Sequence, residues 1–218
     1  MLNCSIGRYA TRLIALISLC VITSVASAES MSGSTAGQNL NRLLAGVGSL
    51  SASFEQTVLD GGGTRLQQSH GELLLARPGK FRWSTAEPFP QLLVSDGDTL
   101  WIYDQDLEQV TQQAVDKRLT NTPALLLSGD LESLQQSFQI SGPLSGDNGN
   151  YRLTPIDEEA MFSTLLIAFK DGLPVEMQLE DSLGQKTSLN FNDLVLNPDV
   201  SDAEFVFQVP DGVDLIAE

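Results

Sequence analysis

Residues 65–103 read RLQQSHGELLLARPGKFRWSTAEPFPQLLVSDGDTLWIY, and this stretch decides the fold class. Apolar runs at 73–75, 92–94 and 100–103 are separated by turn residues, among them Arg-Pro-Gly at 77–79 and Asp-Gly at 96–97. Asp-Gly between two apolar runs is a strong signal for a tight β-hairpin. The stretch therefore predicts consecutive antiparallel strands rather than helices.

The same pattern continues on both sides of this stretch. Further candidate strands, separated by glycine- and aspartate-containing turns, lie at residues 53–59, 108–115, 138–141, 151–154, 164–169, 175–180, 187–191 and 205–209. About a dozen short strands at this spacing are typical of one antiparallel sheet that is curled or closed. The chain carries no visible repeat and no long linker, so we expect one domain.

Helical patterns interrupt the strands at two places. Apolar residues with a helical period (Leu40, Leu43, Leu44 and Val47) predict an amphipathic helix near the start. Thr122 is a candidate N-cap, and Pro123 stands at the first helical position of an apolar segment that ends near residue 128. A further short helix is expected after Asp130.

Several strands are apolar at consecutive positions, at residues 73–75, 92–94 and 100–103. A sheet with one buried and one solvated face should alternate instead. Two explanations stay open at this point. Helices cover one face and a second sheet covers the other, or the sheet curls so that its concave face lines an apolar cavity that short helices close.

The first 28 residues have the pattern of a cleavable signal peptide. Arg8 and Arg12 precede an uncharged run at 13–25, and Ala-Ser-Ala at 26–28 is a small-residue cleavage site. The run is too short for a membrane span. Acylation of Cys20 is a rival, but Leu19 before it is larger than such sites prefer. We expect a disordered leader at 29–38, a single domain at 39–218 and a periplasmic location.

Composition excludes several classes of function. The chain has 218 residues and a net charge of −16, from 12 basic and 28 acidic residues, which opposes binding to nucleic acid. Removal of the signal would take away two arginines and both cysteines and leave a charge of −18. Such a charge also opposes stable insertion into anionic membranes. We expect a soluble monomer.

The chain contains few of the residues and motifs that are typical of catalytic sites. The only histidine is His70, in a polar segment, and no nucleophile elbow, phosphate-binding loop or zinc motif occurs. The acidic run at 157–159 lacks the spacing of a calcium loop. We therefore predict no enzymatic activity, no cofactor and no metal.

Taken together, several segments resemble the LolA family of periplasmic outer-membrane lipoprotein carriers. These segments are FEQT at 54–57, RPGKFRW at 77–83, VSDG at 94–97 with LWIY at 100–103, NTPALLL at 121–127, QLED at 178–181 with GQ at 184–185, and FVF at 205–207 before Pro210. They span the mature chain in the family's order. Each piece is weak alone, but the ordered set is specific.

The resemblance implies a mainly β (α+β) fold, a single incomplete antiparallel β-barrel of about eleven strands with short α-helices as a lid over an apolar cavity. It also implies a chaperone that takes acylated lipoproteins from the inner-membrane ABC transporter LolCDE and delivers them to the outer-membrane receptor LolB. Two alternatives stay open: a carrier of another acylated or polyketide-type lipid, and a lipid hydrolase that would need a nucleophile near His70.

The resemblance also assigns roles to individual residues. Arg77 matches the family's arginine that holds the lid shut through backbone hydrogen bonds, although an ordinary arginine at a strand end would look the same. Phe81 matches an aromatic residue at the cavity rim on the side where the transporter docks; a plain core phenylalanine is the alternative. Cavity or lid positions are expected for the remaining candidates, which are Trp83, Leu125, Leu126 and Leu127.

Overall fold

Most strands in this chain pair with the next strand in sequence, to which a short turn connects them. Together the strands form one large open sheet. The computed structural model describes residues 35–115, 127–128, 131–157, 160 and 162–217. The strands are β1 (Ser49–Leu59), β2 (Arg65–Ala76), β3 (Lys80–Glu87), β4 (Gln91–Asp96), β5 (Thr99–Asp104), β6 (Gln109–Ala114), β7 (Phe138–Ser141), β8 (Gly149–Pro155), β9 (Phe162–Lys170), β10 (Leu173–Asp181), β11 (Lys186–Leu196) and β12 (Asp214–Ala217).

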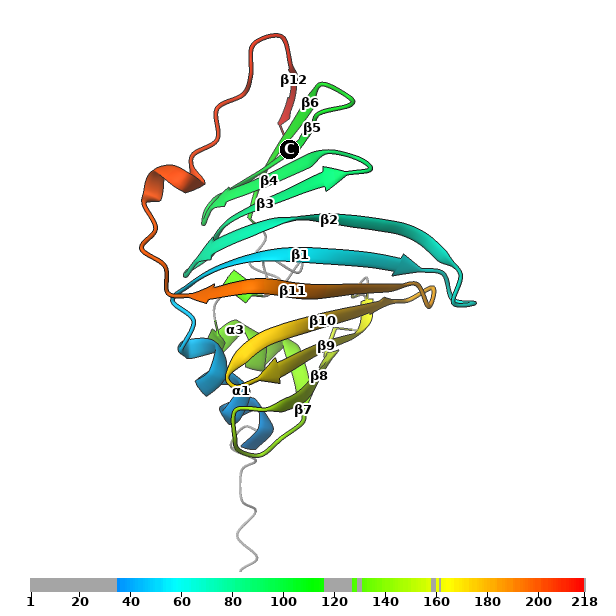
Figure 1. Ribbon diagram of the computed structural model, residues 1–218, viewed down its shortest axis with the longest axis vertical. Coiled ribbons are helices and arrows are strands. Elements are labelled where there is room, and N and C mark those ends of the chain that lie inside the picture. The colour runs from blue at the N-terminus through cyan, green and yellow to red at the C-terminus, as the bar shows by residue number, and fades with distance from the viewer. Residues whose placement is uncertain (1–34, 116–126, 129–130, 158–159, 161, 218) are drawn as a thin grey trace, which may run out of the picture. The chain divides into compact units, whose positions relative to one another are not determined.

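The order of these strands in the sheet is β12-β6-β5-β4-β3-β2-β1-β11-β10-β9-β8-β7. The first strand lies in the middle, where β2 and β11 pair with it on either side (Figure 1). Because β12 and β7 stand at opposite edges, the sheet does not close on itself. The expected incomplete barrel is therefore confirmed.

The C-terminal end of the chain departs from the expectations in two ways. Twelve strands are present among the described residues instead of about eleven, and β12 pairs with β6 in parallel, so the sheet is not wholly antiparallel. The predicted strand at 205–209 is wrong. Its first residue ends the short 3-10 helix η1 (Asp202–Phe205), and the segment that follows it pairs with no strand of the sheet.

Besides η1 and the helical residues 127–128, two α-helices accompany the sheet in the described part of the chain. The first, α1 (Thr35–Ala45), confirms the predicted amphipathic helix but begins earlier, so residues 35–38 do not belong to a disordered leader. Ala36 is 3% exposed, and its burial explains why the helix extends through this small-residue segment. The other, α3 (Leu131–Ser137), confirms the helix predicted after Asp130 and contacts α1 and β7. The expected signal peptide and most of the helix predicted at 122–128 lie outside the described residues.

One hydrophobic core occupies one face of the sheet, which we call the inner face. It contains the apolar stripe of α1 together with alternate residues of the strands, for example Leu50 and Phe54 on β1, Leu73 on β2 and Trp83 on β3. Side chains at every second position share a face of a strand, and this periodicity is why these residues are buried together.

The opposite, outer face carries a smaller apolar cluster over β4, β5 and β6. Val94 and Val110 are fully buried there, and Phe205 from η1 is 1% exposed. The ring of Phe207 lies 6.2 Å from that of Trp101 and 6.1 Å from that of Tyr103. Consecutive apolar positions in β4 and β5 thus arise because the inner core covers one face and the C-terminal segment covers the other.

Candidate functional site

Beside the core, the inner face of the sheet forms one wall of a cavity of about 370 Å³, which we call the inner cavity. Its apolar wall is formed by four side chains: Trp83, Phe89, Leu93 and Leu179. Phe89 follows β3 and is 62% exposed, so this wall reaches the surface at the turns between strands. A volume near 370 Å³ lies at the lower end of the range of about 300–1,000 Å³ that holds small organic ligands.

Trp83 is held in place by an aromatic contact that depends on a glycine. Its ring centroid lies 4.2 Å from that of Phe54, at an interplanar angle of 33°. Gly71 of β2 pairs with Phe54 across the ladder, and a Cβ atom built there would lie 2.7 Å from the Phe54 ring. The missing side chain at residue 71 therefore gives the Phe54 ring the space it occupies beside Trp83.

Polar side chains also line the inner cavity, among them Asp104 and Thr187. Five of them lie on neighbouring strands, and we call these five the polar strip: Gln56, Gln67, Ser69, Thr85 and Gln91. Ser69 pairs directly with Gln56 across β1 and β2, and Thr85 pairs with Gln91 across β3 and β4. The cavity is therefore amphiphilic, with aromatic and aliphatic side chains beside hydroxyl and amide groups.

The turn between β2 and β3 attaches two helical segments to the sheet. The Nε of Arg77 donates a hydrogen bond of 3.0 Å to the carbonyl of Val47, just beyond the end of α1. Two residues on, the backbone N–H of Gly79 donates to the carbonyl of Ser128 at 2.8 Å. A cation beside carbonyls at a helix C-terminus is favourable, because those carbonyls carry partial negative charge.

The Arg77 side chain bonds to backbone just beyond the end of α1. The side-chain hydrogen bond described above goes to the carbonyl of Val47, and the role of Arg77 in holding a lid shut stays a prediction. The N–H of Gly79, two residues further on, bonds to Ser128 of the segment at 127–128. Sequence reasoning missed this function of Gly79, although its place in the Arg-Pro-Gly turn marks it as a special backbone position.

The other predicted site residues lie in or beside the core. Phe81 is fully buried on β3 and belongs to the core, so in this structure it presents no surface at a rim. Trp83 lines the inner cavity and is 5% exposed. Leu127 is 2% exposed within the core. Leu125 and Leu126 lie outside the described residues.

Helix α1 is fixed by a polar network of Asn39 and Arg42 that the sequence pattern did not indicate. The Asn39 side-chain amide donates to the hydroxyl of Tyr151 and to the carbonyl of Gly146. Arg42 donates to Asn39 and forms an ion pair of 2.8 Å with Asp147. Burial raises the pKa of the Tyr151 phenol above its usual value, although the hydrogen bond from Asn39 acts in the opposite direction.

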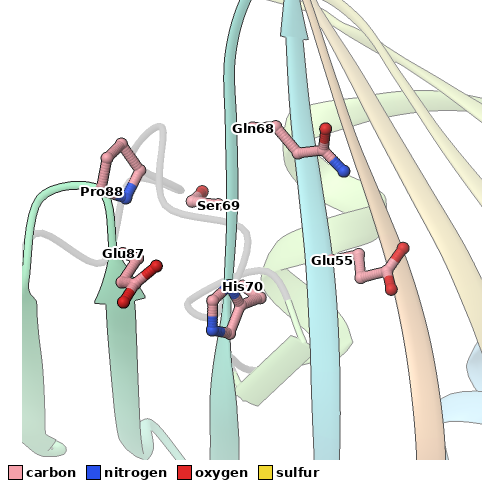
Figure 2. Close-up of a pocket in the computed structure, with 6 residues that line it drawn as sticks. All are labelled: Glu55, Gln68, Ser69, His70, Glu87 and Pro88. Atoms are coloured by element: carbon pink, nitrogen blue, oxygen red, sulfur yellow. The ribbon is translucent and has the colours of Figure 1, made fainter.

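A second pocket, of about 350 Å³, surrounds the only histidine (Figure 2). His70 on β2 pairs with Glu55 on β1 and with Glu87 on β3, and all three side chains are exposed. Ser69 is buried, and successive side chains of a strand point to opposite faces, so this neighbour does not form a dyad with His70. Among the described residues that line this pocket, none pairs with His70 as a nucleophile.

No group of three or more histidine, cysteine, aspartate or glutamate side chains in the described ranges has the arrangement of a metal site. No helix in the same ranges combines the length and the apolar character that a membrane span requires.

Comparison with known proteins gives a consistent result. The family described as outer membrane lipoprotein carrier protein LolA matches residues 45–208. The outer-membrane lipoprotein carrier protein of Azotobacter vinelandii is 46% identical over 181 residues, covering 83% of this chain and 87% of the relative. The protein of the same name from Pseudomonas aeruginosa is 44% identical over 207 residues, covering 95% of this chain and all of the relative.

A solved structure supports the fold. The crystal structure of a LolA-superfamily protein from Nitrosomonas europaea superposes with a TM-score of 0.50, covering 79% of this chain and 98% of the other, at 15% identity. At that level of identity the likeness concerns the fold alone. It agrees with an open sheet that carries helices on one face.

Proposed function

This chain belongs to the LolA family of outer-membrane lipoprotein carrier proteins, and from that premise we propose that it is a periplasmic chaperone for acylated lipoproteins. It binds the acyl chains of lipoproteins released from the inner membrane and carries them to the outer membrane. The observation that carries this proposal is the amphiphilic inner cavity at the end of a large apolar core, in a chain at least 44% identical to two proteins named as carriers.

The energetics favour a carrier that encloses its cargo only in part. Burial of each methylene contributes about 0.8 kcal/mol, so three chains of about 15 methylenes would contribute about 36 kcal/mol. Non-covalent affinities end near 18–21 kcal/mol, and a carrier must also release its load. A cavity of about 370 Å³ in this structure fits partial enclosure, with movement of the helices needed before more chain enters.

The partners follow from the family. The inner-membrane ABC transporter LolCDE loads the chain, and the outer-membrane receptor LolB unloads it. Phe81 contacts the transporter once the helices move away, and Trp83 with Leu125, Leu126 and Leu127 lines the cavity or the lid. Arg77 holds the closed state through the end of α1.

The N-terminal 28 residues direct export and are cleaved. The protein performs transport without chemistry on its cargo.

A reconstituted transfer assay tests this function. Inner-membrane vesicles that contain the transporter and a radiolabelled lipoprotein are incubated with the mature protein, and the label in the supernatant is measured. We expect one labelled lipoprotein per carrier, which then passes to outer-membrane vesicles only when the receptor is present. Label that stays on the vesicles, or appears in the supernatant as cleaved fatty acid, contradicts the carrier function.

A further inference from the structure

Ser69 is a buried polar side chain that finds no hydrogen-bond partner among the described residues. Its side chain is 3% exposed, and no donor or acceptor satisfies its Oγ. Leaving a hydroxyl buried and unpaired is unfavourable, so such groups in folded proteins call for an explanation. Because Ser69 also lines the inner cavity, a bound ligand can supply the missing partner.

The surroundings of Ser69 extend this observation to the whole polar strip. Gln56 lies directly opposite Ser69, and Gln67 lies two positions away on the same face of β2. Thr85 pairs with Gly71, which is two positions from Ser69 in the other direction, and with Gln91 on its far side. The five residues therefore form a continuous patch on the inner face of four neighbouring strands, beside the apolar wall.

The chemistry of the polar strip selects its ligand. Hydroxyls and primary amides are uncharged and supply several hydrogen-bond donors. The charged side chain lining the inner cavity is Asp104, an acidic residue, and the net charge of the whole chain is −16. An anionic headgroup such as a phosphate is therefore repelled, whereas neutral carbonyl oxygens are accepted. A bare alkyl chain on this strip would leave the Ser69 hydroxyl unpaired.

We propose that the polar strip binds the ester and amide carbonyls that join the acyl chains to the N-terminal cysteine of the cargo, while the chains themselves lie on the apolar wall. This inference rests on the proposed function and deepens it. The strip recognises the linkage common to all acylated lipoproteins, so recognition does not depend on the sequence of the cargo.

A pair of synthetic ligands tests the proposal. One is an S-(dipalmitoyl-glyceryl)-N-palmitoyl-cysteinyl peptide, and the other is its ether analogue, in which the two ester carbonyls are replaced by methylenes. Dissociation constants are measured by displacement of a fluorescent alkyl dye from the mature protein. We expect the ester ligand to bind about three- to tenfold more tightly than the ether, the range for one neutral hydrogen bond.

Single substitutions test whether the preference for the ester ligand over the ether analogue comes from the polar strip. Ser69→Ala and Gln56→Leu should each reduce the preference for the ester, while Ser84→Ala keeps it, because Ser84 lies on the outer face of β3, next to the inward-facing Trp83. The melting temperature of unliganded Ser69→Ala should stay equal or rise, since the hydroxyl has no partner to lose.

Three results would overturn the proposal: equal affinity of the unmodified protein for both ligands, a full preference retained in Ser69→Ala, or tighter binding of phosphatidylglycerol than of the ester ligand. A fall of several degrees in the melting temperature of Ser69→Ala would also overturn it, by showing a structural role. A protein that binds neither lipopeptide contradicts the proposed function itself.

Discussion

Replacement of Arg77 by leucine should convert the protein into a carrier that loads but does not unload. The change removes the hydrogen bond from the Arg77 Nε to the Val47 carbonyl and leaves the backbone bond from Arg77 N–H to Gly48 in place. A hydrogen bond from a charged donor contributes about 1.5–3 kcal/mol. The equilibrium between closed and open states should therefore shift by roughly tenfold to a hundredfold.

The direction of the effect follows from the state in which the bond forms. If Arg77 is bonded to the end of α1 only when the cavity is empty, its bond favours release of the cargo. Vesicle assays that score loading and transfer to the receptor separately should then show near-normal loading and impaired transfer for Arg77→Leu. Arg77→Lys should be milder, because the charge remains although the guanidinium geometry is lost.

A second arginine provides the matched control. Arg82 lies on β3 between the inward-facing Phe81 and Trp83 and lines an outer-face pocket, so Arg82→Leu should load and unload normally. The reasoning is refuted if folded Arg77→Leu delivers lipoprotein at the normal rate, or if it fails to load at all. Either result would leave Arg77 as a structural residue of the turn.

Three further predictions concern stability. Because burial raises the pKa of Tyr151, the folded state keeps the phenol proton at pH values at which the unfolded state loses it. The free energy of unfolding, measured by urea titration, should therefore fall as the pH rises above about 10. The contribution of Tyr151 to this fall should be absent in Tyr151→Phe. Gly71→Ala should cost about 3 kcal/mol or more in urea unfolding, because the new Cβ would lie 1.9 Å from the Ser84 carbonyl oxygen and close to Phe54; a loss below 1 kcal/mol would contradict this contact. Phe205→Ala should cost about 3–5 kcal/mol by the same measurement and expose tryptophan fluorescence to quenchers, since the outer cluster loses its buried ring; an unchanged midpoint would show that the cluster contributes nothing.

Local patterns were sufficient to predict most of the sheet. The Asp-Gly hairpin at 96–97 and the apolar runs around it correspond to β4 and β5 within a residue or two, and α1 followed from its apolar period. These features depend on neighbours in the sequence: turn geometry, alternation of period two and helical spacing. The resemblance to the family rested on the same ordered segments and is confirmed.

The C-terminal segment shows where local patterns fail. Phe205 and Phe207 alternate with other residues as in a strand, yet neither joins the sheet. Phe207 packs against Trp101 and Tyr103 of β5, and η1, which ends at Phe205, contacts β3 and β4. A segment with an apolar residue at every second position can pair as a strand of a sheet, or it can pack its apolar side chains against an exposed apolar surface. Which of the two the C-terminal segment does depends on strands that lie more than 90 residues earlier in the chain.

The sequence by itself therefore determined the class of fold, the approximate strands and the family, because each of these depends on short-range spacing and composition. Only the tertiary structure decided that Arg77 bonds to the end of α1, that Phe81 is fully buried, and that Ser69 lines a cavity with no hydrogen-bond partner in the part of the chain that the structure describes. These properties depend on strand register and on the contact of segments far apart in the chain. A polar residue in a strand looks the same in sequence whether it faces water or a cavity, and the pairing of β1, β2 and β3 makes that choice.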